Sequence, residues 1–189
     1  MKRIPIVPTL LVLLAVAYMI HLGLWQLDRL KQKEAMLARY EAARSDKGVH
    51  PWPNDDIAPL GYTHLRLDCR STGDTAPQAG RNAQGQSGWA QVAVCTVPDG
   101  GHARVVLGWS ANPASVRWSG GIVTGTYLPR GDEVIVVADP PLAGLQANAK
   151  PDPRDIPNNH LAYAVQWFLF AGLALVIYAL ALRKRMRGG

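Results

Sequence analysis

Two apolar runs, one near each end of the chain, constrain the fold more than any other feature. The first extends from Ile4 to Leu24 and the second from Leu161 to Leu182. Each run is about 20 residues long, enough for a helix to cross a hydrocarbon core roughly 30 Å thick. The stretch between them has an ordinary polar composition. The sequence therefore predicts one extramembrane domain held between two transmembrane α-helices.

The net charge of +6 is concentrated beside these runs. Residues 1–44 hold seven Lys or Arg and three Asp or Glu, and residues 183–189 hold four basic residues. The central residues 45–158 hold nine basic and eleven acidic residues, so this part is slightly acidic. Nucleic-acid binding requires a basic patch on the folded domain, whereas contact with lipid headgroups accounts for juxtamembrane charge. We expect a lipid bilayer, and no nucleic acid, as a partner.

The basic ends also predict an orientation. Lys2 and Arg3 precede the first run, and the cluster RKRMR follows the second. By the positive-inside rule, both termini face the cytoplasm and the central domain faces outward. Four basic residues oppose this orientation, and the tail cluster outweighs them: Arg29, Lys31, Lys33 and Arg39. We expect a two-pass protein of a bacterial inner membrane with a periplasmic central domain.

The N-terminal run also has features of a secretory signal. Ala15-Val16-Ala17 matches a cleavage site, but the apolar run continues to Leu24, which favours an uncleaved anchor. Residues 25–44 contain no Gly or Pro and are rich in good helix formers, so the helix should continue into water. This extension is either a stalk for docking or a helix packed on the domain. Five segments are expected: transmembrane helix 1–24, helical extension 25–44, β-rich domain 45–157, transmembrane helix 158–182 and basic tail 183–189.

The central domain has the period of β-structure. In YTHLRLDCR, Leu65, Leu67 and Cys69 lie on one face and charged residues on the other, which predicts a half-buried strand. Residues 71–88 and 140–157 are rich in turn residues and predict loops. Four more β-rich runs follow: GWAQVAVCTV, then HARVVLGWS as its hairpin partner after the turn PDGG, then SGGIVTGTYL and EVIVVAD. We expect a small, mainly antiparallel β barrel or sandwich of about five to seven strands.

Two cysteines, Cys69 and Cys95, both fall in this domain. An oxidising compartment permits a disulfide between them, and two small buried thiols are the alternative. Their spacing matches no CxxC motif. The sequence alone leaves both possibilities open.

The central domain lacks motifs of catalysis. It contains no HExxH, no GxSxG and no phosphate-binding loop. The adjacent carboxylates Asp55-Asp56 and Asp132-Glu133 are typical of solvated surface. Three histidines lie far apart without ligand spacing: His50, His64 and His102. We expect no enzyme and no catalytic residue.

Two histidines inside the apolar segments are stronger candidates, because an ionisable residue in a membrane helix is often functional. His21 lies near the end of the first run and His160 at the start of the second. At helical spacing, Tyr18, His21 and Trp25 share one face. On the second helix one face holds His160, Tyr163, Ala164, Trp167 and Ala171. If these faces meet, they form an aromatic pocket with one or two imidazoles.

The residues before His160 favour a ligand role. Asn158 or Asn159 can cap the helix by accepting a free backbone N–H. His160 then lies in the first turn, where the helix dipole favours a neutral imidazole, the form that binds haem iron. His21 lies near the C-terminal end of its helix, where the dipole favours the protonated form. The alternative is an interfacial histidine among interfacial aromatic residues.

Two longer motifs carry a family resemblance. LGLWQLDRLKQK at 22–33 and IPNNHLAYAVQWFLFAGLAL at 156–175 resemble the two signatures of the Surfeit-locus (Shy-type) cytochrome c oxidase assembly proteins. Between them, GRNAQGQSGWAQVAVCTVPDGG and VVLGWSANPA resemble the middle of the family in order and spacing. One departure is that Leu107 precedes Gly108-Trp109, where the family usually carries arginine. The central domain is also short for the family.

The resemblance implies a function. It indicates an assembly factor that assists insertion of haem a into the catalytic subunit of a haem-copper oxidase, with His160 handling the haem. His21, Tyr163 and Trp167 are further candidates for the haem site. A surface for docking the oxidase subunit is expected at Trp25, Gln26, Arg29 and Trp167. Two alternatives are a permanent accessory subunit of an oxidase and a membrane-anchored β domain with an unrelated binding role.

Overall fold

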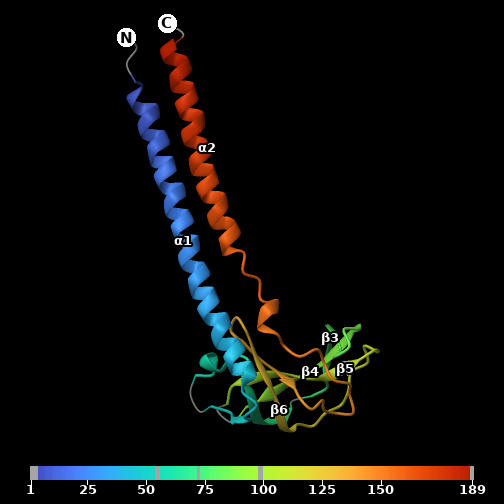
Figure 1. Ribbon diagram of the computed structural model, residues 1–189. Helices are drawn as coiled ribbons and strands as arrows, with labels where there is room; N and C mark the ends of the chain where they lie inside the picture. The colour runs from blue at the N-terminus through green and yellow to red at the C-terminus, as the bar shows by residue number, and fades with distance from the viewer. Residues whose placement is uncertain (1–3, 54–55, 72, 98–99, 188–189) are drawn as a thin grey trace. The chain divides into compact units, whose positions relative to one another are not determined.

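The computed structural model describes residues 4–53, 56–71, 73–97 and 100–187. The chain forms two compact units, one of Met1–Met36 with Ile156–Gly189 and one of Leu37–Asp155. Some positions named above lie outside the described residues: Lys2, Arg3, Asp55, Pro98 and Asp99. The first unit is a helix pair, and the second is a β domain (Figure 1).

Helix α1 spans Ile6–Ser45 as one element of 40 residues, so it passes from the first unit into the second. It ends at the expected place. The Ser45 hydroxyl donates to the Glu41 carbonyl at 2.8 Å, and the Gly48 N–H donates to the Asp46 carboxylate at 2.8 Å. These short-range bonds compete with further helical bonds and end the helix.

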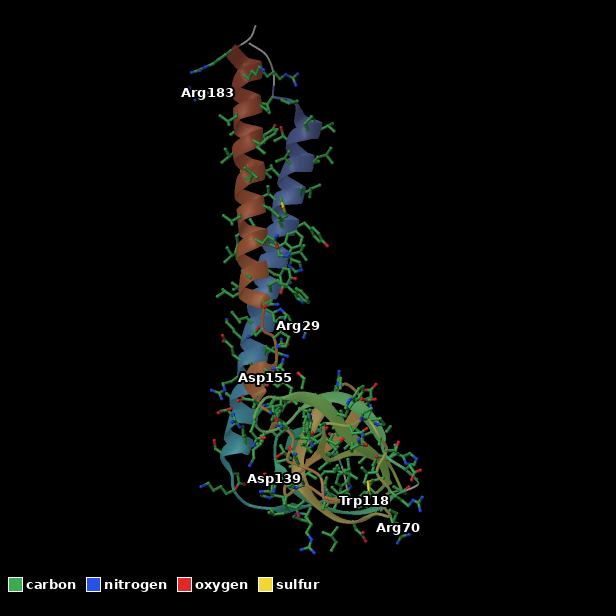
Figure 2. All side chains as sticks on the ribbon, turned by 90° about the vertical axis from the view of Figure 1, so that its right-hand side faces the viewer. Arg29, Arg70, Trp118, Asp139, Asp155 and Arg183 are labelled. Carbon is green, nitrogen blue, oxygen red and sulfur yellow. A yellow bond between two sulfur atoms is a disulfide. The ribbon has the colours of Figure 1, made fainter. Side chains whose placement is uncertain are left out.

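Helix α2 spans His160–Arg187 and runs antiparallel beside the membrane part of α1 (Figure 1). Contacts at two levels fix this direction. The hydroxyls of Thr9 and Tyr178 are hydrogen-bonded to each other, and His160 is bonded to Gln26. Both helices are long and apolar enough to cross a membrane. Most of their side chains are carbon-rich and project away from the pair, and Arg183 lies near the end of α2 (Figure 2).

The two helices face each other along a repeat of alternating three- and four-residue steps, the spacing of left-handed helix pairs. Among the described residues of the pair, four are buried: Val16 and Gly23 on α1, and Ala164 and Ala171 on α2. Half-buried residues continue each stripe: Thr9, Val12, Met19 and Gln26 on α1, and His160, Trp167, Ala174 and Tyr178 on α2.

The β domain is a closed barrel. Its seven strands are β1 His50–Pro51, β2 His64–Ser71, β3 Ala76–Arg81, β4 Ser87–Thr96, β5 His102–Ser110, β6 Gly121–Arg130 and β7 Glu133–Ala138. The sheet order is β1-β2-β6-β7-β5-β4-β3, and an additional pairing of β2 with β4 closes the ring. Most pairs are antiparallel, while β5–β7 and β1–β2 are parallel. Two short 3-10 helices also occur, at Ala58–Leu60 and Pro153–Asp155. Of the two expected architectures, the barrel is the one that forms.

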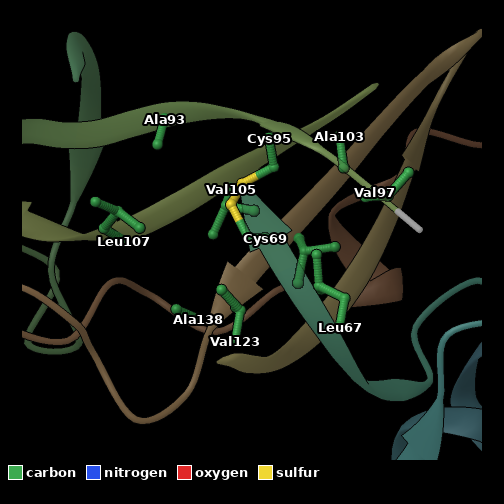
Figure 3. Packing of buried hydrophobic residues seen from close by; sticks show 11 residues of the cluster. Leu67, Cys69, Ala93, Cys95, Val97, Ala103, Val105, Leu107, Val123 and Ala138 are labelled. Atoms are coloured by element: carbon green, nitrogen blue, oxygen red, sulfur yellow. A yellow bond between two sulfur atoms is a disulfide. The ribbon is translucent and has the colours of Figure 1, made fainter. Parts of the chain in front are cut away.

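The barrel interior is a continuous apolar core (Figure 3). The alternation predicted for β2 is confirmed, since Leu65, Leu67 and Cys69 are each at most 2% exposed. Cys69 and Cys95 form a disulfide inside this core, which decides between the two possibilities left open by the sequence. Leu107, at the position where the resembling family usually carries arginine, is fully buried.

Short strands form in two segments, one of which is the predicted loop at residues 71–88. Residues 71–88 include β3, which pairs with the first half of β4, and the proline-rich segment after residue 49 includes β1. Neither strand has the apolar alternation of the others, because both add to the outside of the ring and bury little. Their prolines, Pro51 and Pro77, are tolerated because edge strands leave one side unpaired.

The last residues of α1 pack on the β domain within the second unit. The Tyr40 and Tyr62 rings lie 5.0 Å apart between centroids, and Arg44 Nη1 lies 3.2 Å from Asp152 Oδ2. Of the two alternatives for the helical extension, this end of it follows the packed one.

Candidate functional site in the helix pair

The first turn of α2 is joined to α1 by a hydrogen bond between the two signature motifs. His160 Nδ1 lies 2.8 Å from Gln26 Oε1, across 134 residues of sequence. An amide oxygen only accepts, so the imidazole Nδ1–H donates. Both residues are half-buried. Within the described part of the chain, no other hydrogen bond to the His160 ring is formed, so Nε2 is available to a ligand.

The helices approach closely because small residues line the contact. A Cβ placed on Gly23 would lie 2.7 Å from Cε1 of Phe168, so the Phe168 ring would have to move to admit a side chain there. Ala164 and Ala171 present only methyl groups to α1. Small residues allow membrane helices to pack closely. Gly23 lies one turn from Gln26, so this close packing brings Gln26 within reach of His160.

Trp167 lies on the same stripe of α2, two turns along from His160. Its indole is half-buried, and it packs edge-on against Phe170 with centroids 6.2 Å apart and planes at 88°. The structure therefore places an aromatic ring on the His160 side of the helix, as the spacing predicts.

The other aromatic candidates do not join this site. Tyr18, His21 and Trp25 are exposed, and so is Tyr163 on α2. His21 and Trp25 each lie two residues from Gly23, about 200° around the helix, so they face away from α2. The condition for a shared aromatic pocket, that the two histidine faces meet, is therefore not fulfilled. His160 meets Gln26, and not His21.

Trp25 and Arg29 form an outward-facing pair on α1. The Arg29 guanidinium carbon lies 5.5 Å from the Trp25 ring centroid, and Nη1 donates to Gln32 Oε1 at 2.8 Å. Gln26, which the sequence grouped with them, faces His160 instead. The outward-facing pair is the surface available to a partner.

The asparagines before His160 do not form the expected side-chain cap. Asn159 occupies the N-cap position, because its backbone carbonyl accepts from the Tyr163 N–H at 3.2 Å. The Asn158 side-chain oxygen is buried and has no hydrogen-bond partner among the described residues. An unpaired buried acceptor of this kind leaves a polar group for which the helix pair itself supplies no donor.

The polar groups of the β domain serve its structure. Gln91 is fully buried, accepts from the Thr75 hydroxyl at 2.7 Å and donates to the Ala114 carbonyl at 3.0 Å. In the described residues, no group of three His, Cys, Asp or Glu side chains could hold a metal ion.

Charges gather where the end of α1 meets the segment before α2. The side chain of Arg154 donates to Asp152 at 2.6 Å, and its backbone N–H donates as well, at 2.9 Å. These bonds hold the pKa of Asp152 below its usual range. Burial raises the pKa of Tyr62, which packs under this segment. This cluster explains how the end of α1 is held on the domain.

Together, these features define a class: a two-pass membrane protein whose helices flank a small extramembrane β barrel, with a polar contact in the helix pair. A family model places the chain more narrowly, since the SURF1 family model matches residues 13–172. The match covers most of the chain and includes the first signature and residues 156–172 of the second, so the chain belongs to the SURF1 family. A comparison with curated proteins found no match.

Family membership gives the chain a role in cytochrome oxidase assembly, where members of this family act as assembly factors. The resemblance read from the two signatures is thereby confirmed. The bond between Gln26 and His160 is the element that sequence reasoning missed. One signal for it in the sequence is that each residue stands in one of the two signatures.

Proposed function

We propose that the chain binds haem a through His160 and assists its insertion into the catalytic subunit of a cytochrome oxidase. The observation that supports this is the unengaged Nε2 of a half-buried imidazole inside a helix pair. Haem iron accepts a neutral imidazole nitrogen as an axial ligand. Trp167, on the same stripe, supplies an aromatic surface beside a macrocycle. The donor set and the apolar surroundings fit this group.

We assign one ligand from this chain. His21 is exposed on the side of α1 away from α2, so it does not share a site with His160. Tyr163 is also exposed, at 51%, and contributes to the outer surface only. The proposed site therefore consists of His160 with Trp167 as a wall.

The haem content of single variants tests this assignment. In a host that makes haem a, His160→Ala should lower the haem bound per purified protein at least tenfold, because the iron loses its axial nitrogen. His21→Ala should keep most of it. The absorption spectrum in the Soret region, referred to protein concentration, gives the measurement. Membrane insertion of each variant serves as the control, and full haem content in His160→Ala would refute the ligand assignment.

We propose a transient, non-enzymatic factor in preference to a permanent subunit. In the helix pair, Nε2 of His160 makes no hydrogen bond among the described residues and remains accessible. An accessible ligand atom suits a haem that is bound and then released. Purification of the mature oxidase separates the two cases. A factor is absent from the finished complex, and a subunit remains in it at a stoichiometric ratio.

We propose that Trp25 and Arg29, with Trp167, contact the catalytic subunit. An exposed tryptophan with a guanidinium over its ring has the composition of a protein interface. A photo-crosslinking residue placed at position 25 in native membranes should capture the oxidase catalytic subunit. The same residue at position 14, a lipid-facing leucine on α1, serves as the control. Equal yields from the two positions would contradict the proposal.

We propose that both termini are cytoplasmic and the β domain periplasmic, in a bacterial inner membrane. Because the two helices are antiparallel, the start of α1 at Ile6 and the end of α2 at Arg187 lie on the same side of the membrane. The tail that follows α2 on this side is basic, which favours the cytoplasm. The disulfide in the barrel suits an oxidising compartment. Alkaline phosphatase fused after Asp155 should be active. An inactive fusion with an active cytoplasmic reporter at the same place would reverse the topology.

A further inference from the structure

We propose that Gln26 is a positioning residue for His160: it holds the imidazole in the tautomer that carries its proton on Nδ1, so that Nε2 is the ligating nitrogen. This inference rests on the proposed haem function. It adds which nitrogen faces the iron and which residue of the other helix decides it.

The donor and acceptor roles are set by chemistry. Gln26 Oε1 lies 2.8 Å from Nδ1, which is hydrogen-bonding distance. With the amide oxygen of Gln26 facing the ring, a proton on Nε2 would leave two lone pairs facing each other across this distance. The neutral ring therefore has its proton on Nδ1, and its one remaining lone pair is on Nε2.

The surroundings strengthen this preference. Both side chains are half-buried at the ends of the two apolar runs, where water competes less well for polar groups than it does at an exposed surface. An amide or imidazole left unpaired there would cost free energy. In metal sites, a ligating histidine almost always donates its other N–H to an acceptor that fixes tautomer and ring orientation. Gln26 occupies that place for His160.

The backbone supports the geometry from α1. Gly23 lets the Phe168 ring pack where a side chain would otherwise lie, and this contact is one turn from Gln26. Because the acceptor comes from α1 and the ligand from α2, the correct nitrogen is presented only when the helices are paired. The tautomer of His160 thus reports on the assembly of the helix pair.

Nitrogen NMR of the full-length protein without haem tests the inference directly. The chain is labelled with ¹⁵N-histidine in lipid nanodiscs, and the His160 signals are assigned by their absence from His160→Ala. In the wild type, His160 should show a protonated Nδ1 and an unprotonated Nε2. Gln26→Leu, which removes the acceptor, should shift the ring towards the Nε2-protonated tautomer. Gln26→Glu, which keeps an acceptor oxygen, should retain the wild-type pattern.

The matched control is Gln166→Leu, the same substitution at an exposed glutamine of α2. It should leave the His160 signals unchanged. A wild-type ring protonated on Nε2, or an unchanged tautomer in Gln26→Leu, would overturn the inference whether or not haem is bound.

Haem titration then separates this inference from the function on which it rests. Gln26→Leu should weaken haem affinity by about 10- to 100-fold, the usual effect of removing such a partner, and Gln26→Glu should restore much of it. If His160→Ala loses haem while Gln26→Leu keeps both tautomer and affinity, Gln26 has no positioning role and the proposed function stands. If His160→Ala binds haem normally while the tautomer depends on Gln26, the haem assignment falls and the control of the tautomer stands.

Discussion

The β domain and the helix pair are built on opposite principles. The barrel encloses a cluster of buried side chains joined by a disulfide (Figure 3). In the described part of the helix pair only Val16, Gly23, Ala164 and Ala171 are buried, and large apolar residues such as Leu169 are more than half exposed. The β domain withdraws its apolar surface from water by itself, whereas the helix pair leaves that surface to lipid.

This difference decides what specifies each unit. Apolar burial stabilises the barrel, and each buried methylene contributes about 0.8 kcal/mol. Lipid is as apolar as leucine, so the same effect does not drive the two helices together. Close fit at Gly23 and hydrogen bonds at two levels select their register. Substitutions should therefore act separately in the two units.

The largest loss of stability is expected when the disulfide is removed. Replacing both Cys69 and Cys95 by alanine releases a loop of 26 residues, and chain-entropy estimates for such a loop give a loss of about 3.5 kcal/mol. The barrel should melt on the order of 10 °C lower. Differential scanning calorimetry of the full chain in nanodiscs measures this, and the NMR tautomer of His160 should remain that of the wild type. A changed tautomer would mean that the two units are coupled.

A smaller effect, confined to the helix pair, is expected from Gly23→Leu. The added side chain collides with Phe168, and overpacking of this kind costs about 1–3 kcal/mol. The bond between Gln26 and His160 should lengthen or break, which the tautomer signal detects, while the barrel melts at the wild-type temperature. Gly172→Leu is the matched control, because a Cβ there meets open space. An equal effect from both substitutions would show that close fit does not specify the pair.

The smallest effect is expected from Asp152→Asn. Hydrogen bonds from Arg154 lower the pKa of Asp152 in the folded state, so their stabilisation is fully present above about pH 4 and is lost as the pH falls through the lowered value. The wild type should thus lose stability on acidification relative to the variant, and by little, since the pair is exposed to solvent. Melting temperatures of both proteins between pH 3 and pH 7 give the difference. A variant that is more stable at neutral pH would contradict this sign.

The sequence predicted the parts of the fold that follow a simple period. The apolar runs gave both membrane helices, and alternation gave β2 and the hairpin of β4 and β5. It missed β3, because an edge strand that buries little needs no apolar alternation. It also could not choose between barrel and sandwich, since closure depends on two pairings at the ends of β2 and β4.

The candidate site was predicted in part. Helical spacing correctly placed His160 and Trp167 on one stripe of α2. On α1, helical spacing gave the wrong face. The aromatic residues suggested that their own face turns towards α2, whereas the face that contacts α2 is the one that carries Gly23. A glycine carries little signal in a hydropathy pattern, yet it fixes which side of a membrane helix can approach another. A search for small residues would have put Gln26 opposite His160.

The two edge strands restrict how this domain can meet other proteins. An open sheet edge invites another chain to add a strand. Here the ring is closed, and the additional strands β1 and β3 each contain a proline, Pro51 and Pro77, which has no N–H to offer an incoming strand. The two prolines therefore disfavour edge-to-edge aggregation of the barrel with other copies of itself. Recognition by strand addition is also disfavoured, so a partner of the barrel would have to bind its side-chain surfaces.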